Sequence, residues 1–420
     1  MLFMKSTIIK LATLLLIISA FSANTAYSQQ KISLFTWVPA EEQKINKQLI
    51  EEFQRRNPDI TVAYMNDPTK RSMDKLQTMF VAGTAPDVMS IHGAYFVPFA
   101  SRGLLLPLNG LIKKDTEFNL SAFYSTLIDG CKYNNKLYSL PRFTSVYVLF
   151  YNKKLFDEAG IKYPDETWTW QEFLNASIKL TKDSNKDGIT DQYGCVLDFW
   201  GARLYPWIWQ NDSTAFDAEK NICTLNYPKT AEALQFLCDL RFKHKVVPVT
   251  ISMESKSNVE MFRTGKAGMF MSGAWEIQNL RYDNKINWGI APLPKNAKRA
   301  TMLGMENYAI YSKTKKPDAA WKLMKFLLNE KNQLLLATNL EKQPSLISVA
   351  KEYAKNNEDF SRKVLTDAMN YGVVPPNFKQ WNRIETVMQE KLDSIWIGKL
   401  DLKKGLDEAT ERINKILNEK

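Results

Sequence analysis

The sequence has few of the residues from which catalytic centres are usually built. Only two of its 420 residues are histidines, His92 and His244. It contains no Gly-x-Ser-x-Gly elbow, His-Glu-x-x-His pair, Walker-type phosphate loop or Gly-x-Gly-x-x-Gly dinucleotide motif. These absences favour a protein that is not an enzyme. Plentiful Asp and Glu nevertheless leave open a glycan-processing hydrolase that uses two carboxylates.

Cysteine is also scarce, and none of the four has the Cys-x-x-Cys spacing of a redox or zinc motif. Cys238 shares an apolar helical face with Leu234 and Leu237, as expected of a core residue. Disulfides form in exported proteins, and a Cys195–Cys223 disulfide is one alternative for this chain. The sequence does not decide the state of the four cysteines, which are Cys131, Cys195, Cys223 and Cys238.

A concentrated basic segment is missing as well. The formal net charge is +11, but Lys and Arg are scattered, with no dense block and no zinc-finger spacing. Nucleic-acid-binding proteins gather such charges on one face or element. We therefore expect a solvated basic surface and no nucleic-acid partner.

Only the amino terminus carries a long apolar run. Lys5 and Lys10 precede the apolar residues 11–21, and Ala26-Tyr27-Ser28 fits the small-x-small rule for signal peptidase. This pattern predicts export to the periplasm, with residues 1–28 removed near Ser28. A retained amino-terminal anchor is the alternative, although the run is short for a membrane span.

The remaining length is more than one hydrophobic core usually holds, so two lobes are expected. Strand-like residues 31–37, 60–65 and 87–91 alternate with helical patterns over 41–56 and from Ser72 to Gly83. This order predicts an α/β fold with mostly parallel sheets flanked by helices. No Pro/Ser/Gly linker separates the lobes, which suggests that the chain crosses between them more than once.

The later part of the chain carries further element signals. Residues 145–151 are strongly strand-prone, and residues 268–272 and 286–291 are apolar and strand-like. Thr169 with Glu172 three residues later has the form of a capping box at a helix start. Residues 230–243 form an amphipathic helical pattern, and Pro317 suits the first position of another helix. The C-terminal third reads as helical.

Ligands of parallel α/β sheets bind beyond the carboxyl ends of the strands. In this sequence those positions hold Trp37, the Asn66-Asp67 turn and His92. They are candidate ligand-binding residues, although His92 also fits a structural role. His244, between two lysines, fits a solvated helix end.

Eleven tryptophans are present, and several lie beside polar residues. Sugars stack their C–H faces on aromatic rings and direct their hydroxyl groups to polar partners, so such clusters are candidate sugar sites. Core packing is the alternative for each ring. Trp275 is the strongest candidate because Glu276 is adjacent and Gly273 permits a close approach. The candidates of this kind are Trp200, Trp207, Trp275 with Glu276, and Trp381.

Residues 183–191 have oxygen-bearing side chains at alternate positions and glycine at the sixth, the spacing of an EF-hand calcium loop. The twelfth position is Gly194, so the usual bidentate Glu is missing. No cofactor is expected, and a structural calcium ion is the one candidate. The alternative is a turn that caps itself through side-chain hydrogen bonds. The candidate ligands are Asp183, Asn185, Asp187, Ile189 through its carbonyl, and Asp191.

Several segments together resemble the family 1 extracellular solute-binding proteins of ABC importers, which include the maltose-binding protein. The resemblance covers nearly the whole chain after the signal peptide. Each segment alone is weak, but their shared order is specific. The segments are Gly83-Thr84-Ala85-Pro86-Asp87-Val88, residues 149–156 with Ala159-Gly160-Ile161, Thr167-Trp168, residues 265–269 with Gly273-Ala274-Trp275, residues 291–294, and Leu303-Gly304 with Tyr308-Ala309-Ile310.

The resemblance implies a two-lobed, type II periplasmic binding protein fold with the ligand cleft between the lobes. It places lobe 1 at residues 29–142 and 304–343, and lobe 2 at residues 143–303 and 344–420. Three crossovers are expected near residues 141–144, 301–306 and 343–345. The implied partners are a solute and a membrane permease, with the receptor itself a monomer.

By position, the resemblance implies that Trp37, Asp87, Trp275 and Trp381 border the cleft. Asp87 equally fits a turn cap. Met305 stands where the family often has a second glycine, which puts the local pocket shape in doubt. Asp67, Asp87, Arg142 and Glu306 would exchange hydrogen bonds with the ligand.

The resulting prediction is an exported receptor that closes around an oligosaccharide or related polyol and delivers it to an ABC permease. Three alternatives stay open. The first is a receptor for another solute, such as a phosphorylated polyol or a peptide, for which Arg142 and Arg203 are the candidate phosphate contacts. The second is the glycan-processing enzyme. The third is a sensor that signals to a membrane kinase.

Overall fold

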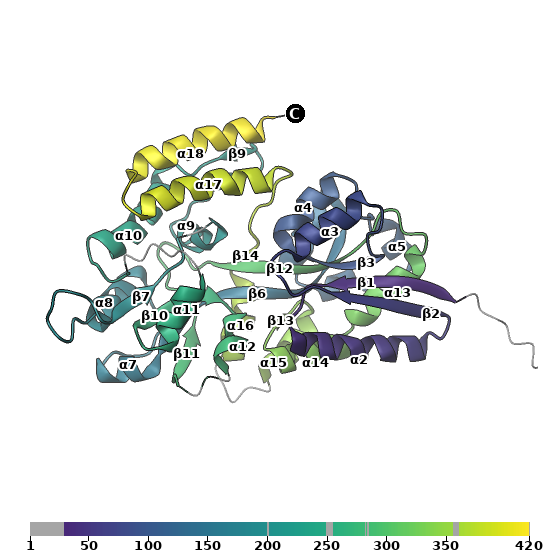
Figure 1. Cartoon of the computed structure of the whole chain (residues 1–420), viewed down its shortest axis with the longest axis horizontal. Helices are drawn as coiled ribbons and strands as arrows, with labels where there is room; N and C mark the ends of the chain where they lie inside the picture. Colours follow the sequence, from purple (N-terminus) through teal and green to yellow (C-terminus); the bar gives the residue numbers. More distant parts are fainter. Residues whose placement is uncertain are drawn as a thin grey trace, which may run out of the picture.

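The computed structural model describes residues 29–199, 201–248, 255–281, 283, 285–355 and 361–419. The predicted signal peptide and Trp200 lie outside these residues. Figure 1 shows two lobes connected by long strands, with helices on both faces of the sheets. No helix in the described ranges is long and apolar enough to span a membrane.

The N-terminal lobe is built on the predicted strand–helix–strand order, in which β1 pairs in parallel with both β2 and β3. Helix α3 begins at Ser72, so Ser72 is its first residue rather than its cap, and Arg71 occupies the cap position. The elements are β1 (Gln30–Thr36), α2 (Ala40–Arg56), β2 (Ile60–Asn66), α3 (Ser72–Val81), β3 (Val88–His92), α4 (Gly93–Ser101), α5 (Asn109–Lys114), η1 (Leu120–Ala122), α6 (Ser125–Asp129), β4 (Lys132–Tyr133), β5 (Lys136–Leu137), α13 (Pro317–Leu327) and α14 (Glu330–Leu340).

The C-terminal lobe has a shorter mixed sheet in which β10 pairs in parallel with β7 and antiparallel with β6. The capping box of Thr169 and Glu172 is present at the start of α8, as predicted. The elements are α7 (Lys153–Glu158), α8 (Trp170–Leu180), β7 (Tyr193–Val196), η2 (Gly201–Leu204), α9 (Tyr205–Gln210), β8 (Phe216–Asp217), β9 (Ile222–Cys223), α10 (Pro228–Phe242), α11 (Ser255–Arg263), β10 (Ala267–Gly273), α12 (Glu276–Arg281), β11 (Trp288–Ala291), α17 (Trp381–Trp396) and α18 (Leu402–Leu417).

Three strands connect the lobes. The long strand β6 (Ser139–Asn152) pairs antiparallel with β12 (Thr301–Ile310) in its first half and with β10 and β11 in its second half. The short strand β13 (Gln343–Pro344) pairs with β6 at Thr144 and Phe143. The predicted crossover segments at β12 and β13 are therefore both hydrogen-bonded to the one at β6, and the exact lobe boundaries remain predictions. The last elements are α15 (Ile347–Lys355), α16 (Ser361–Asp367), η3 (Ala368–Asn370) and β14 (Gly372–Val373).

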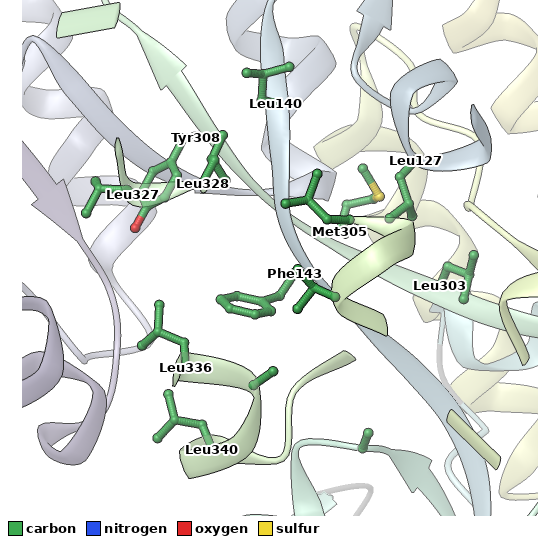
Figure 2. Close-up of a cluster of buried hydrophobic side chains, with 14 of the residues drawn as sticks. Leu127, Leu140, Phe143, Leu303, Met305, Tyr308, Leu327, Leu328, Leu336 and Leu340 are labelled. Atoms are coloured by element: carbon green, nitrogen blue, oxygen red, sulfur yellow. The ribbon is translucent and has the colours of Figure 1, made fainter. Parts of the chain in front are cut away.

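The hydrophobic cores differ between the two faces of the connecting strands. On one face a single cluster extends from α2, α13 and α14 in one lobe to α12 in the other. Figure 2 shows part of it, with Phe143, Met305 and Tyr308 beside leucines from neighbouring helices. On the other face the core under α3 and α4 is separate from the core under α8, α9 and α17. The lobes therefore share one continuous core on the first face, whereas on the other face the main cores are separate and Ala94 of α4 packs against the core of the C-terminal lobe.

All four cysteines are buried and free, so the Cys195–Cys223 bridge is absent from this structure. Burial raises the pKa of Cys195 to about 12. Cys238 belongs to the core of the C-terminal lobe, as its helical position predicted.

Candidate functional site

The carboxyl ends of the first three strands lie on the face where the cores are separate. Trp37 and Tyr95 pack half-buried against the core of the N-terminal lobe. His92, the last residue of β3, meets the Trp37 ring edge-on with the ring centroids 5.8 Å apart. Two of the predicted strand-end residues are thus neighbours, at the border with the other lobe.

His92 is exposed, yet the surrounding protein lowers its pKa by disfavouring the charged form, against the opposing charge of Glu306. Its Nδ1 accepts a hydrogen bond of 3.2 Å from the amide of Ala94. In the neutral ring the proton is therefore on Nε2, which is available as a donor to a ligand.

Asp67 lies beside this group but is occupied. Its carboxylate accepts hydrogen bonds from the amide and hydroxyl of Thr69 and is 3.2 Å from the Nζ of Lys75. The hydrogen bond from the Thr69 hydroxyl is the main cause that lowers the pKa of Asp67. Asp67 is therefore a half-buried turn residue whose ligand role stays a prediction.

Four charged side chains form a ring where the crossovers meet. Glu42 comes from α2, Arg142 from β6, Glu306 from β12, and Lys342 from the residue before β13. Arg142 Nη2 bonds Glu42, and its Nη1 is 3.1 Å from Glu306 Oε2. Lys342 Nζ is 2.8 Å from Glu42 Oε2 and 3.2 Å from Glu306 Oε2. Two positive and two negative charges thus balance one another.

Burial and charge oppose each other in this ring. Glu42 and Arg142 are almost completely buried, whereas Glu306 and Lys342 keep part of their side chains exposed. Burial would raise the pKa of Glu42, but Arg142 and Lys342 lower it to about 2. Arg142 also lies over the Tyr308 ring at 5.0 Å. Of the two predicted ligand contacts here, Glu306 keeps part of its side chain exposed, and Arg142 is buried and bonded to it.

Trp275 is the centre of a second group, contributed by the C-terminal lobe. Its side chain is 37% exposed, and its Nε1 donates to Glu276 Oε1 at 3.0 Å. The ring packs directly on Gly273, where an added Cβ would lie 1.9 Å from it. Arg203 lies 5.9 Å from the ring centroid, and Tyr147 is 6.2 Å away. Gly273, as predicted, permits this arrangement.

Glu276 and Arg203 are held by further hydrogen bonds. Glu276, which is buried, accepts from Asn279 at 2.8 Å. Arg203 pairs with Asp198, which in turn accepts 2.6 Å from Asn258. A ring with one exposed face and polar groups at its edge is an arrangement suited to stacking against a sugar.

Three predicted ligand residues lie elsewhere. Trp207 is 2% exposed and packs against Trp170, Phe173 and Phe236 in the core of the C-terminal lobe. Trp381 is 3% exposed and packs against Phe216 and Phe378. At both positions the structure favours core packing, the alternative given for each ring, over a stacking role.

Asp87 is the third. It lies at the amino end of β3, the end opposite to His92. One carboxylate oxygen accepts from the amide and hydroxyl of Ser33, at 2.8 and 2.9 Å, and the other accepts from Thr314. Asp87 therefore ties β1 to the end of β12, and the structure favours the capping role over the ligand role.

The calcium-like loop is exposed, and its carboxylates bond its own backbone. Gly188 N donates to Asp183 Oδ2 at 2.9 Å, and Ile189 N donates to Asp187 Oδ1 at 2.7 Å. In the described parts of the chain, no group of three or more His, Cys, Asp or Glu is placed to hold a metal ion. Of Asn185 and Asp191, the first bonds Asp187 and the second accepts from Ser184. The donor geometry fits the self-capping turn, and calcium stays a prediction.

Sequence reasoning missed several members of the site. Glu42 and Lys342 carry no motif, and Tyr147 reads simply as part of a strand-prone run. Glu385, on α17, is half-buried near both lobes and was not singled out. A charged residue at a crossover segment was the one available signal, and it applied to Arg142 and Glu306.

Comparisons with known proteins agree with this architecture. Residues 39–334 match the model of a family described as bacterial extracellular solute-binding protein. The galactooligosaccharide-binding protein of Bacillus subtilis is 27% identical over 402 residues, which cover 93% of this chain and 90% of that protein. Both chains therefore align over almost their full lengths.

Solved structures give the same result. An ABC substrate-binding protein of Listeria monocytogenes, in complex with cycloalternan, has a TM-score of 0.84 and 26% identity. The alignment covers 93% of this chain and 100% of that one. A Streptomyces glaucescens receptor, solved without ligand and with acarbose, has a TM-score of 0.80, 22% identity and coverages of 93% and 99%. At that identity the likeness concerns the fold alone.

Proposed function

Because the chain belongs to the family of bacterial extracellular solute-binding proteins, we propose that it is a receptor for an oligosaccharide or a related polyol. The ligand binds between the lobes, on the face where the two cores are separate. Trp37 and His92 contact it from the N-terminal lobe, Glu306 from a crossover, and Trp275 with Glu276 from the C-terminal lobe.

Trp275 is the observation on which the carbohydrate proposal chiefly rests. Large aromatic side chains are usually buried in this chain, but the Trp275 ring is exposed, fixed by Gly273 and bordered by Glu276 and Arg203. The galactooligosaccharide-binding and cycloalternan-binding relatives support the same ligand class.

Binding is coupled to closure in this proposal. The lobes are connected by three hydrogen-bonded strands and by one continuous core on one face, and they open and close on the opposite face, where α17 and Asn377 reach α4 between separate cores. A ligand that contacts both lobes does so fully only when they are closed. Its binding therefore shifts the population towards the closed state.

We also propose the location of the protein and its membrane partner. It is exported, its signal peptide is cleaved near Ser28, and it acts as a monomer. It delivers its ligand to an ABC permease, and it has no catalytic activity of its own. A phosphorylated ligand is disfavoured because Arg142 and Arg203 are both already bonded to carboxylates.

A thermal-shift panel tests the ligand class with galactotriose, maltotriose, mannobiose and cycloalternan, against glycerol 3-phosphate and a tripeptide. A ligand at about 100 times its Kd stabilises the folded state by about 2.7 kcal/mol. Trp275→Ala should abolish the shift, because it removes the partly exposed ring on which the sugar stacks. A shift with glycerol 3-phosphate or the tripeptide, and with none of the saccharides, would overturn the carbohydrate proposal. Turnover of a glycoside would overturn the receptor proposal.

A further inference from the structure

Helix α17 extends from the C-terminal lobe towards the other lobe. It packs against α4 of the N-terminal lobe and against η2 of its own lobe (Figure 1). Just before it, Asn377 Nδ2 donates to the carbonyl of Gly93, at the start of α4, over 2.6 Å. Trp381 at the start of the helix is buried, and Glu385 lies one turn further along the same helix.

Glu385 is a half-buried carboxylate without a partner. Burial raises its pKa, and no neighbouring charge or hydrogen bond opposes this effect. The structure gives it no hydrogen bond and no ion pair within the described ranges. Glu42, Glu306 and Asp198 are each paired with a cation, and Glu276 accepts hydrogen bonds from Trp275 and Asn279. A desolvated, unpaired carboxylate lowers the stability of the folded state.

The surroundings of Glu385 contain aromatic hydroxyl groups from both lobes. Burial, together with the charges of Asp74 and Glu385, raises the pKa of Tyr95 on α4. The pKa of Tyr205 on α9 is likewise raised, first by burial and then by Cys223 and Glu385. The Tyr205 hydroxyl is buried and unpartnered within the described part of the chain. Glu385 is thus within electrostatic reach of both lobes.

Gly201 lies next to the carboxylate of Glu385. It has a φ of +45°, and an added Cβ would lie 3.7 Å from Glu385 Oε1. The absence of a side chain there leaves the carboxylate open on that side. Glu385 therefore has an open acceptor, two tyrosine rings nearby and no cation among the charges that affect its titration. A donor group of a ligand that bonds this half-buried carboxylate would offset the desolvation of its charge.

We propose that Glu385 is a specificity-determining residue that accepts a hydrogen bond from a donor group of the bound saccharide. The donor is a hydroxyl or a protonated amine, since both offset an unpaired carboxylate. This inference rests on the proposed function and adds a residue to it. It implies that the unliganded protein is less stable because Glu385 is ionised, as is common at sites kept ready for a ligand.

Glu385→Gln keeps the shape of the side chain and removes the charge. It therefore tests both the proposed hydrogen bond to the ligand and the proposed destabilisation of the unliganded protein by the charge. Without ligand the melting midpoint should rise, because a desolvated charge is removed. With ligand the affinity should fall about tenfold or more, since hydrogen bonds to charged groups are the stronger ones. Glu390→Gln, in the same helix but exposed and paired with Arg412, is the matched control and should leave the affinity unchanged.

The ligands for this test are the neutral saccharide of the panel that binds best, and glucosamine trimer. A loss of affinity for the neutral saccharide identifies a hydroxyl donor, and a loss confined to glucosamine trimer identifies the amine. Unchanged affinity for both overturns the inference, as does a lower unliganded midpoint, which would indicate a structural role. If wild type itself binds neither saccharide, the proposed function fails, and that result is seen before any variant is made.

Discussion

Replacement of Glu42 by Gln should reveal how much the ring of charges stabilises the fold. Glu42 is fully buried, and its pKa falls from 4.5 to about 2 on folding. One pKa unit corresponds to about 1.4 kcal/mol, so the ionised carboxylate contributes about 3 kcal/mol at neutral pH. Glu42→Gln should lower the free energy of unfolding by about that amount at pH 7.

The pH dependence gives the sharper test. Because the folded pKa is depressed, the contribution is complete above about pH 4.5 and is lost as the pH falls towards about 2. At about pH 3 less than half of it should remain. The difference between wild type and variant should therefore narrow on acidification, even as both become less stable.

Urea unfolding followed by tryptophan fluorescence at the two pH values measures this difference. Glu41→Gln, an exposed neighbour in the same helix, controls for the loss of a negative charge from the start of α2. The reasoning is refuted if Glu42→Gln is as stable as wild type at pH 7. It is refuted equally if the difference is the same at both pH values, because then the charge of Glu42 is not its source.

Three further predictions follow from packing and loop geometry. Trp381→Ala should lower the free energy of unfolding by about 3–5 kcal/mol, because it empties a buried site; a small effect in urea unfolding would contradict its burial. Gly194→Ala should also destabilise, by about 1–3 kcal/mol or more, because a Cβ there would lie 2.0 Å from the Ser177 carbonyl oxygen; an unchanged melting midpoint would contradict this close packing. Calcium and a chelator should leave the melting midpoint unchanged, since the carboxylates of the 183–191 loop bond its own backbone; a fall with chelator that Asp187→Asn removes would instead support the bound ion.

The contact at Gly194 also explains why the calcium-like motif is incomplete. A Glu at the twelfth position would have to replace a glycine that lies directly against the backbone of α8. The spacing of the first nine residues is a local property that the sequence displays directly. What stands opposite the twelfth position depends on how β7 packs on α8, which the local pattern does not contain.

The tryptophans also show that a local sequence pattern does not determine which side chains become buried. Trp207, Trp275 and Trp381 all lie among aromatic and polar neighbours in the sequence, and all three are sugar-stacking candidates, with Trp275 the strongest. Only Trp275 has an exposed ring. The adjacent Gly273 was the one sequence signal that separated it, because a glycine permits the ring to fold back on the strand.

The sequence by itself determined the order of strands and helices, the two-lobed α/β class and the family resemblance, because hydrophobic periodicity, caps and short motifs are local. It also placed Trp37 and His92 at the ends of adjacent strands. Only the tertiary structure decided which charges are paired and which are not. Glu42, Arg142, Glu306 and Lys342 meet because three crossovers and a helix converge, and Glu385 stands apart because no element brings a cation to it. Such pairings join residues up to 300 positions apart, and no local pattern encodes them.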